Sequence, residues 1–184
     1  MVHEELFIST GDQLMIDMLV FDWGGTVMTD SGEPGPMFLW EKVSWVPGAE
    51  KALEQLRRFP CCIATNAGVS DTQAMIKALK RVGAYKCFQF FFSSKDLGYV
   101  KPDPRFFRMI CRETRMQPAG CVMIGNDYGK DICGAKEAGM RTVFYYPGLT
   151  TEDFPMADAV IRRMDELPAI ILRWDEGGNQ HIIV

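Results

Sequence analysis

The sequence lacks the features that mark several classes of protein. It has only two histidines, His3 and His181, and its six cysteines include no Cys-x-x-Cys pair, so a zinc site built from these ligands is not expected. No apolar run approaches 18 residues, and Glu4 and Glu5 stand where a secretory signal would carry lysine or arginine. We therefore expect a cytoplasmic protein that neither spans a membrane nor is exported, with reduced cysteines in its core.

The charge balance favours a small charged ligand over nucleic acid. The net charge is −4, and no dense run of lysine and arginine appears. The length of 184 residues suits one domain, and no repeat or low-complexity linker divides the chain. We predict a single domain over residues 1–184, with a leader arm at 1–16 and a polar tail at 173–184.

Short apolar segments alternate along the chain with amphipathic ones. Met18 to Phe21 form an apolar run without alternation, which is typical of a strand buried on both faces. The same pattern predicts further strands at 61–64, 87–92, 121–124, 142–146 and 159–161. Helical spacing and capping residues predict helices at 48–59, 71–82, 104–115 and 164–172, and one that ends at Gly139. This alternation predicts an α/β fold, a mostly parallel sheet with helices on both faces.

Residues 28–47 form a segment too rich in glycine and proline for a continuous helix. The segment nevertheless carries a cluster of apolar side chains, including Phe38, Trp40 and Trp45. One interpretation is that this flap packs on the body of the protein. The other is that it forms a lid or a subunit contact in a homo-oligomer.

Polar residues follow four of the predicted strands, and in a parallel sheet these strand ends meet at one rim. Each residue has an ordinary explanation as a turn residue, a solvated charge or a helix cap. A carboxylate, a hydroxyl, an ammonium and a carboxylate pair in this order are improbable by chance, and we interpret them as one site. Its candidates are Asp22, Thr65 with Asn66, Lys101, and Asp127 with Asp131.

These residues give the chain a resemblance to the haloacid dehalogenase superfamily of hydrolases, over about residues 17–150. The segment Asp22-Trp-Gly-Gly-Thr26 is similar to the first motif of that family, Thr65-Asn66 to its second, Lys101-Pro102 to its third, and 125–131 to its fourth. The resemblance implies a three-layer Rossmann-like fold. No stretch of the sequence is long enough for a large cap domain.

The resemblance implies phosphoryl transfer through an aspartyl-phosphate on Asp22. The catalytic residues would be Asp22, Thr65 and Lys101, and the metal would be Mg²⁺. Lys101 would balance the negative charge, while the Thr65 hydroxyl and the backbone N–H groups of Trp23, Gly24 and Asn66 would hold the phosphate oxygens. The ligands of Mg²⁺ would be the Asp22 carboxylate, the Gly24 carbonyl and Asp127, with Asp131 bracing them or bound through water. The substrate would be a small phosphorylated metabolite or a phosphorylated macromolecule.

Gly24 departs from the family pattern. Phosphatases of the family carry a second aspartate there, which protonates the leaving oxygen and then activates water. General acid–base catalysis contributes about 10²–10⁴ in rate, so its loss predicts slow turnover of esters with poor leaving groups. The Asp-Trp-Gly-Gly-Thr form is closest to the phosphonoacetaldehyde hydrolase branch, which uses a lysine from a cap; here Lys42 and Lys51 are only nominal substitutes.

Three hypotheses stay open. The first is a Mg²⁺-dependent phosphatase, and the second is a hydrolase of carbon–phosphorus or carbon–halogen bonds. The third is a non-catalytic relative that keeps the phosphate and metal cradle for binding. The paired acids weigh against the dehalogenase branch, because that branch works without metal.

Overall fold

The computed structural model describes residues 15–68, 70–149, 151–177 and 182–183. Most of the predicted leader arm lies outside these residues. Ile16 is buried, and its backbone N–H donates to a carboxylate oxygen of Asp175 at 3.2 Å. This contact joins the chain just before the first strand to the end of the last helix.

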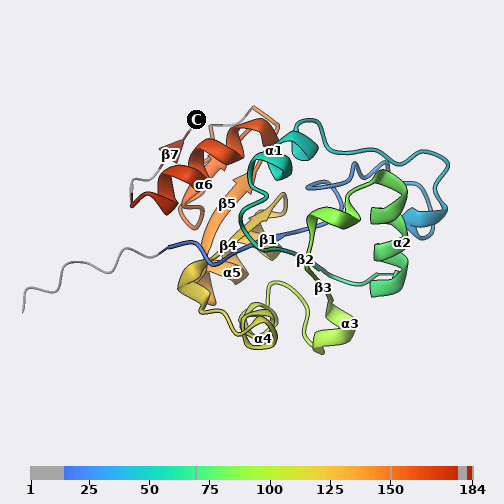
Figure 1. Cartoon of the computed structure of the whole chain (residues 1–184), viewed down its shortest axis with the longest axis horizontal. Coiled ribbons are helices and arrows are strands. Elements are labelled where there is room, and N and C mark those ends of the chain that lie inside the picture. The colour runs from blue at the N-terminus through green and yellow to red at the C-terminus, as the bar shows by residue number, and fades with distance from the viewer. Residues whose placement is uncertain (1–14, 69, 150, 178–181, 184) are drawn as a thin grey trace, which may run out of the picture.

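A parallel sheet of seven strands forms the centre of the described structure, in the order β3-β2-β1-β4-β5-β6-β7 (Figure 1). Every neighbouring pair of strands is parallel. Because β1 lies in the interior with β2 and β4 on its two sides, its carboxyl end is at the middle of the rim. The strands are β1 (Met18–Phe21), β2 (Cys61–Thr65), β3 (Phe90–Ser93), β4 (Cys121–Gly125), β5 (Arg141–Tyr145), β6 (Ala159–Ile161) and β7 (Ile182–Ile183).

Helices cover both faces of the sheet, which gives the predicted three-layer α/β architecture (Figure 1). On one face lie α1 (Ala49–Gln55), α2 (Thr72–Val82) and α6 (Leu167–Asp175); on the other lie α3 (Ser94–Leu97), α4 (Pro104–Thr114) and α5 (Gly134–Glu137). Short turns are η1 (Met37–Leu39), η2 (Tyr85–Cys87), η3 (Pro118–Gly120), η5 (Met164–Glu166) and a wide π-type turn, η4 (Tyr128–Cys133).

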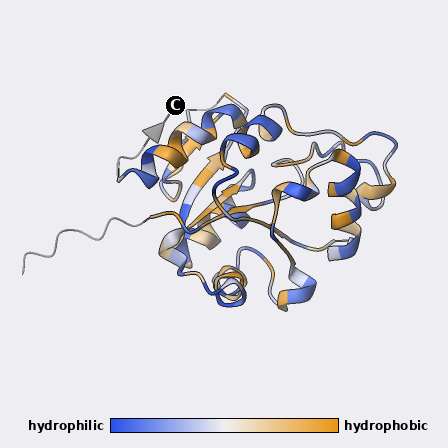
Figure 2. Cartoon of the chain, in the orientation of Figure 1, coloured by the Kyte–Doolittle hydropathy of each residue, from blue (hydrophilic) through white to orange (hydrophobic). Residues whose placement is uncertain are grey.

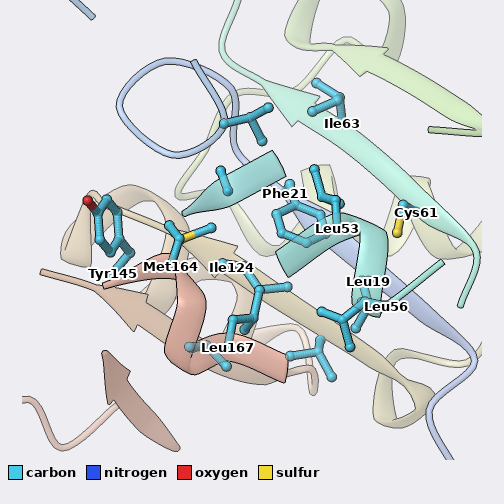
Figure 3. Close-up of a cluster of buried hydrophobic side chains, with 14 of the residues drawn as sticks. Leu19, Phe21, Leu53, Leu56, Cys61, Ile63, Ile124, Tyr145, Met164 and Leu167 are labelled. Carbon is cyan, nitrogen blue, oxygen red and sulfur yellow. The ribbon is translucent and has the colours of Figure 1, made fainter. Parts of the chain in front are cut away.

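Strand β1 is buried on both faces, as its apolar run predicts. Leu19 and Phe21 pack in the core under α1, α2 and α6, whereas Met18 and Val20 pack in the core under α3 to α5. Figure 3 shows Leu19 and Phe21 beside side chains from α1 and the neighbouring strands. In Figure 2, the hydrophobic residues, coloured orange, are concentrated on the central strands. Thus β1 is held from both sides, and its end is a fixed position for Asp22.

Several boundaries differ from the sequence prediction. Helix α1 ends at Gln55 rather than 59, because the chain turns through residues 56–58 before Pro60. Strand β3 begins at Phe90, since the expected strand start at 87 belongs to η2. The expected connection at 93–100 contains α3, which Ser93 and Asp96 close with a reciprocal capping box.

The predicted polar tail at 173–184 is wrong in part. Helix α6 begins at Leu167 after η5 and continues to Asp175, and Trp174 is buried in the core. Ile182 and Ile183 pair with β6 as β7. The apolar surface of Trp174 explains why the helix extends past the predicted end at 172, because an additional turn removes this ring from water.

The 28–47 segment folds back as a loop with a closed base. The N–H of Thr29 donates to the Ser44 carbonyl at 3.0 Å, and the N–H of Val46 donates to the Val27 carbonyl at 2.9 Å. Its middle packs against α2, where the Arg81 guanidinium donates to the Phe38 and Trp40 carbonyls at 2.8 and 2.6 Å. We call residues 28–47 the 28–47 loop. Of the two interpretations of this segment, the structure shows packing on the body.

All six cysteines are free, and Cys61, Cys62, Cys111 and Cys121 are buried, as predicted for core thiols. Burial raises the pKa of Cys61 to about 12, which keeps its thiol protonated at neutral pH. Among the described residues, no helix has both the length and the apolar composition required to cross a bilayer.

Candidate functional site

Asp22, Lys101 and Asp131 form a cluster at the carboxyl end of β1. The Lys101 ammonium donates to Asp22 Oδ1 at 2.6 Å, to Asp131 Oδ1 at 2.7 Å and to the Ala64 carbonyl at 3.0 Å. All three of its N–H donors are therefore used. The Lys101 side chain is 2% exposed and that of Asp131 is 1% exposed, while that of Asp22 is 13% exposed. Asp22 is thus the member of the cluster that solvent reaches.

Two carboxylates share one ammonium in this cluster, which leaves one negative charge in excess. Burial disfavours the Lys101 ammonium, but the charges of Asp22 and Asp131 outweigh burial and raise its pKa. For Asp131 the balance is the opposite: burial, then the charge of Asp22, raises its pKa to about 6 although Lys101 acts to lower it. The cluster favours the addition of a positive charge, either a proton or a cation.

Gly125 at the end of β4 makes room for Asp131. A Cβ atom at Gly125 would lie 2.3 Å from Asp131 Oδ2 and 2.4 Å from its Cγ, so any side chain there would displace the carboxylate. The same Oδ2 accepts the Asp127 N–H at 3.0 Å. Asp131 is therefore fixed by Lys101 on one oxygen and by the start of η4 on the other.

Asn66 holds the backbone of Lys101. Its side-chain N–H donates to the Lys101 carbonyl at 3.0 Å, and its Oδ1 accepts the Lys101 N–H at 2.8 Å. This reciprocal pair joins the end of β2 to the segment that carries the lysine. Thr65 is half-buried, and its hydroxyl lies 3.5 Å from the Asn66 carbonyl, which is a weak hydrogen bond. The Thr65 hydroxyl is therefore easily redirected towards a ligand.

Asp127 is farther out on the rim and is paired with Lys130. The Lys130 ammonium donates to Asp127 Oδ2 at 2.7 Å. The backbone N–H of Lys130 donates to Asp127 Oδ1 at 2.9 Å. Burial acts to raise the pKa of Asp127, but these bonds outweigh it and lower the pKa. Both side chains are largely exposed, and exposed pairs of this kind contribute only about 0–1 kcal/mol. A competing cation can therefore displace Lys130.

The backbone after Asp22 and the backbone after Thr65 both present polar groups without a hydrogen-bond partner among the described residues. The described residues provide no hydrogen-bond acceptor for the N–H groups of Trp23, Gly24 and Asn66, and no donor for the Gly24 carbonyl. The Trp23 side chain is buried, and its indole N–H donates to Met28 Sδ at 3.0 Å. The backbone N–H of Trp23 is the group that it offers as a donor at this rim.

All of the predicted residues line one pocket of about 470 Å³. They are Asp22, Trp23, Gly24, Thr65, Asn66, Lys101, Asp127 and Asp131. The pocket has further lining residues outside the predicted site. Trp40 belongs to the apolar cluster for which a lid was one interpretation, and Asn126 accepts the Thr26 hydroxyl on its Oδ1 at 3.0 Å. The others are Asp30, Gly35 and Met37 of the 28–47 loop, and Gly68, Ser70 and Lys130. The position of Asn126 in the fourth motif was a usable signal, whereas no local pattern places the loop residues here.

The donors at this rim suit a hard cation such as Mg²⁺, which prefers oxygen ligands. Asp22 has a hydrogen-bond partner only on Oδ1 within the described chain, and the Gly24 carbonyl is unpaired there, so both are available together with Asp127. In the described ranges no three His, Cys, Asp or Glu side chains are grouped closely enough to hold a metal unaided. A site of two carboxylates and one carbonyl is consistent with this finding, and the excess negative charge favours it.

A family model described as "haloacid dehalogenase-like hydrolase" matches residues 37–139, which is more than half of the chain. The chain belongs to this family. The matched range contains Thr65, Lys101, Asp127 and Asp131 but begins after Asp22. The assignment of the first motif therefore depends on the geometry described above, and its likeness to the phosphonoacetaldehyde hydrolase branch stays a prediction.

Several relatives of the chain are named phosphatases. The chain is 38% identical over 109 residues to a phosphoserine phosphatase of Thermus thermophilus, covering 58% of this chain and 43% of the relative. It is 28% identical over 144 residues to a glyceraldehyde 3-phosphate phosphatase of Pyrococcus furiosus, covering 74% of this chain and 58% of the relative. The chain spans about half the length of the curated relatives it matches.

Among solved structures, the chain is similar to the putative HAD-hydrolase YfnB of Bacillus subtilis, which was crystallised bound to magnesium. The TM-score is 0.70 at 17% identity, covering 85% of this chain and 99% of the other. Identity at this level shows a shared fold.

Proposed function

We propose that this hydrolase is a Mg²⁺-dependent phosphatase that cleaves phosphoric monoesters through an aspartyl-phosphate on Asp22. One observation carries the proposal. The Asp22 carboxylate is fixed at Oδ1 by a buried lysine, while Oδ2 has no partner in the described chain and the residue lines the pocket. A carboxylate that is both oriented and accessible is suited to act as a nucleophile.

The residues of the pocket supply the remaining requirements. Asp22 attacks phosphorus, and Lys101 keeps the attacking carboxylate in place and offsets part of its charge. The Thr65 hydroxyl and the N–H groups of Gly24 and Asn66 hold the phosphate oxygens, because these donors are unpaired or weakly paired before binding. Asp22, the Gly24 carbonyl and Asp127 would hold Mg²⁺, which when bound would supply the positive charge that lets the carboxylate and the phosphate approach each other.

The relatives support the reaction class more than the substrate. The Thermus and Pyrococcus proteins are named for phosphate esters of small metabolites, and the Bacillus protein was crystallised with magnesium. We propose as substrate a small phosphorylated metabolite or a phosphorylated side chain of a macromolecule. In the described structure only η1 stands between β1 and α1, so no inserted cap covers the pocket on that side.

The ion pair between Asp127 and Lys130 favours a second candidate, a non-catalytic relative that binds phosphate or metal. In that reading Lys130 takes the place of the cation at Asp127. The remaining alternative, cleavage of a carbon–phosphorus bond through an imine, has less support. Lys42 and Lys51 do not line the pocket. Of the lysines that do, Lys101 is bonded through all three of its donors and Lys130 is paired with Asp127.

Release of phosphate from 4-nitrophenyl phosphate, with Mg²⁺ and with EDTA, tests the proposal. We expect Mg²⁺-dependent turnover in the wild type and in an Asp153→Asn control, in which an exposed aspartate far along the chain is changed. Asp22→Asn should abolish turnover, and a phosphoryl group on Asp22 should be detected by mass spectrometry of rapidly quenched wild type.

Turnover that persists in Asp22→Asn would refute the assignment of the nucleophile. Binding of Mg²⁺ or inorganic phosphate without turnover would support the non-catalytic relative. Release of an aldehyde or halide from candidate substrates would support the carbon–phosphorus or carbon–halogen hydrolase.

A further inference from the structure

We propose that Asp30, from the 28–47 loop, performs the acid–base step for which Gly24 has no side chain. This inference rests on the proposed phosphatase function and deepens it. It concerns a residue that belongs to none of the four motifs and that reaches the pocket only because the loop folds back over the end of β1.

The position of Asp30 relative to Gly24 carries the argument. A Cβ atom built on Gly24 would lie 3.5 Å from Asp30 Oδ2 and 3.9 Å from Asp30 Cβ. The carboxylate of Asp30 therefore lies in van der Waals contact with the position that a Cβ at residue 24 would take. The same Cβ would lie 2.9 Å from Met37 Cε, so the end of the Met37 side chain would have to shift.

The backbone at Gly24 does not itself require glycine. Gly25 has a φ of 79°, in the left-handed region, whereas Gly24 is not among the residues with positive φ. An added Cβ at position 24 is therefore opposed by Met37 rather than by backbone strain. This distinction makes a rescue experiment feasible, since Met37 meets the added atom with the end of a flexible side chain.

The loop holds Asp30 in a defined place. Before it, the Thr29 N–H donates to the Ser44 carbonyl at 3.0 Å and the Thr29 hydroxyl donates to the Trp45 carbonyl at 3.2 Å. After it, the Gly32 N–H donates to Asp30 Oδ1 at 2.9 Å. One oxygen of the carboxylate thus orients the side chain, and Oδ2 has no hydrogen-bond partner in the described chain.

In the proposed reaction, Asp30 donates one proton and later recovers one. Asp22 forms a bond to phosphorus while the bond from phosphorus to the ester oxygen breaks, and protonated Asp30 gives its proton to that leaving oxygen. The Asp30 carboxylate then accepts a proton from water as the water oxygen attacks phosphorus. The bond between Asp22 and phosphorus breaks, which releases phosphate and restores Asp22 as a carboxylate and Asp30 as an acid.

The test compares kcat/KM for two substrates, 4-nitrophenyl phosphate and an alkyl phosphate, in the full chain. The kcat/KM value reports formation of the aspartyl-phosphate, and only the alkoxide leaving group needs a proton at this step. The variant is Asp30→Asn, which keeps the bond from the Gly32 N–H. The matched control is Glu33→Gln, an exposed acid of the same loop that does not line the pocket.

We expect Asp30→Asn to lower kcat/KM for the alkyl phosphate by about 10²–10⁴ and to affect the nitrophenyl ester much less. Glu33→Gln should match the wild type on both substrates. Adding Gly24→Asp to Asp30→Asn should restore part of the alkyl phosphatase activity, and inhibition by inorganic phosphate should be unchanged in Asp30→Asn.

Equal effects of Asp30→Asn and Glu33→Gln would overturn the role of Asp30. A similar loss on both substrates together with weaker inhibition by phosphate would also overturn it, since that result indicates a contribution to binding. Both outcomes leave the phosphatase proposal intact as long as turnover needs Asp22. Absence of any Asp22-dependent turnover in the wild type would instead overturn both proposals.

Discussion

Replacing Lys101 with methionine should destabilise the protein, and the loss should increase with pH. Methionine keeps most of the length and volume of the side chain, so the main change is the loss of the ammonium. Asp22 and Asp131 would then face each other without a counter-charge, and Asp131 is almost fully buried. Removing one partner of a buried ion pair costs about 3–5 kcal/mol, and we expect a loss of this size at pH 8.

The pH dependence follows from Asp131. Its pKa of about 6 in the folded protein lies above its ordinary value of 3.8, so the folded state binds this proton more tightly than the unfolded state. Stability therefore falls as pH rises from about 4 to 7, by roughly 2–3 kcal/mol for this group. Without Lys101 the pKa of Asp131 rises further. A larger fraction of Asp131 is protonated at pH 5 than at pH 8 in both proteins, so their difference in stability should be smaller at pH 5.

Urea unfolding followed by tryptophan fluorescence, without added metal, measures this difference. Lys101 stays charged throughout the range because its own pKa is raised above 10.5. Lys95→Met provides the control, since Lys95 is an exposed lysine in α3. If Lys101→Met and Lys95→Met have the same unfolding free energy at pH 8, or if the loss is no smaller at pH 5, the electrostatic argument for the cluster is wrong.

Three further changes test other parts of the site. Lys130→Ala should lower the Mg²⁺ concentration needed for half-maximal binding, measured by calorimetry, because Asp127 no longer has a competing cation; an unchanged affinity would count against Asp127 as a ligand. Gly125→Ala should cost about 1–3 kcal/mol or more in unfolding free energy and abolish turnover, because the methyl group displaces Asp131. Arg81→Met should cost about 1–3 kcal/mol in unfolding free energy and lower kcat/KM, because the 28–47 loop that carries Asp30 loses its hydrogen bonds to α2; an unchanged kcat/KM would contradict this.

The sequence predicts the sheet and the rim well, because both depend on local patterns. The apolar run before Asp22 has the burial expected of a central strand, and Asp103 with Pro104 begins α4 as its capping pattern indicates. The strand ends then bring Asp22, Lys101 and Asp131 together, because parallel strands present their carboxyl ends on one side. Such features follow from spacing and residue type alone.

Contacts between distant segments could not be predicted in this way. Asp30 and Met37 reach the pocket because Arg81, about 40 residues later, holds the loop on α2, and no periodicity in the loop encodes that contact. The ion pair of Asp127 with Lys130 was also not predicted, although Asp127 caps the start of η4 and Lys130 follows it at N-cap spacing. By contrast, α3 had a readable signal in Ser93 and Asp96, whose spacing is that of a capping box.

Because the base of the 28–47 loop is closed by hydrogen bonds, the length of the loop can change without changing the geometry of the sheet. Thr29 and Ser44 are hydrogen-bonded neighbours, so residues added or removed between them need not move β1 or α1. The cost of a longer connection between fixed ends grows only slowly with its length. This part of the chain is therefore a suitable place for protein engineers to graft longer segments, converting an accessible pocket into a roofed one with a different choice of substrates.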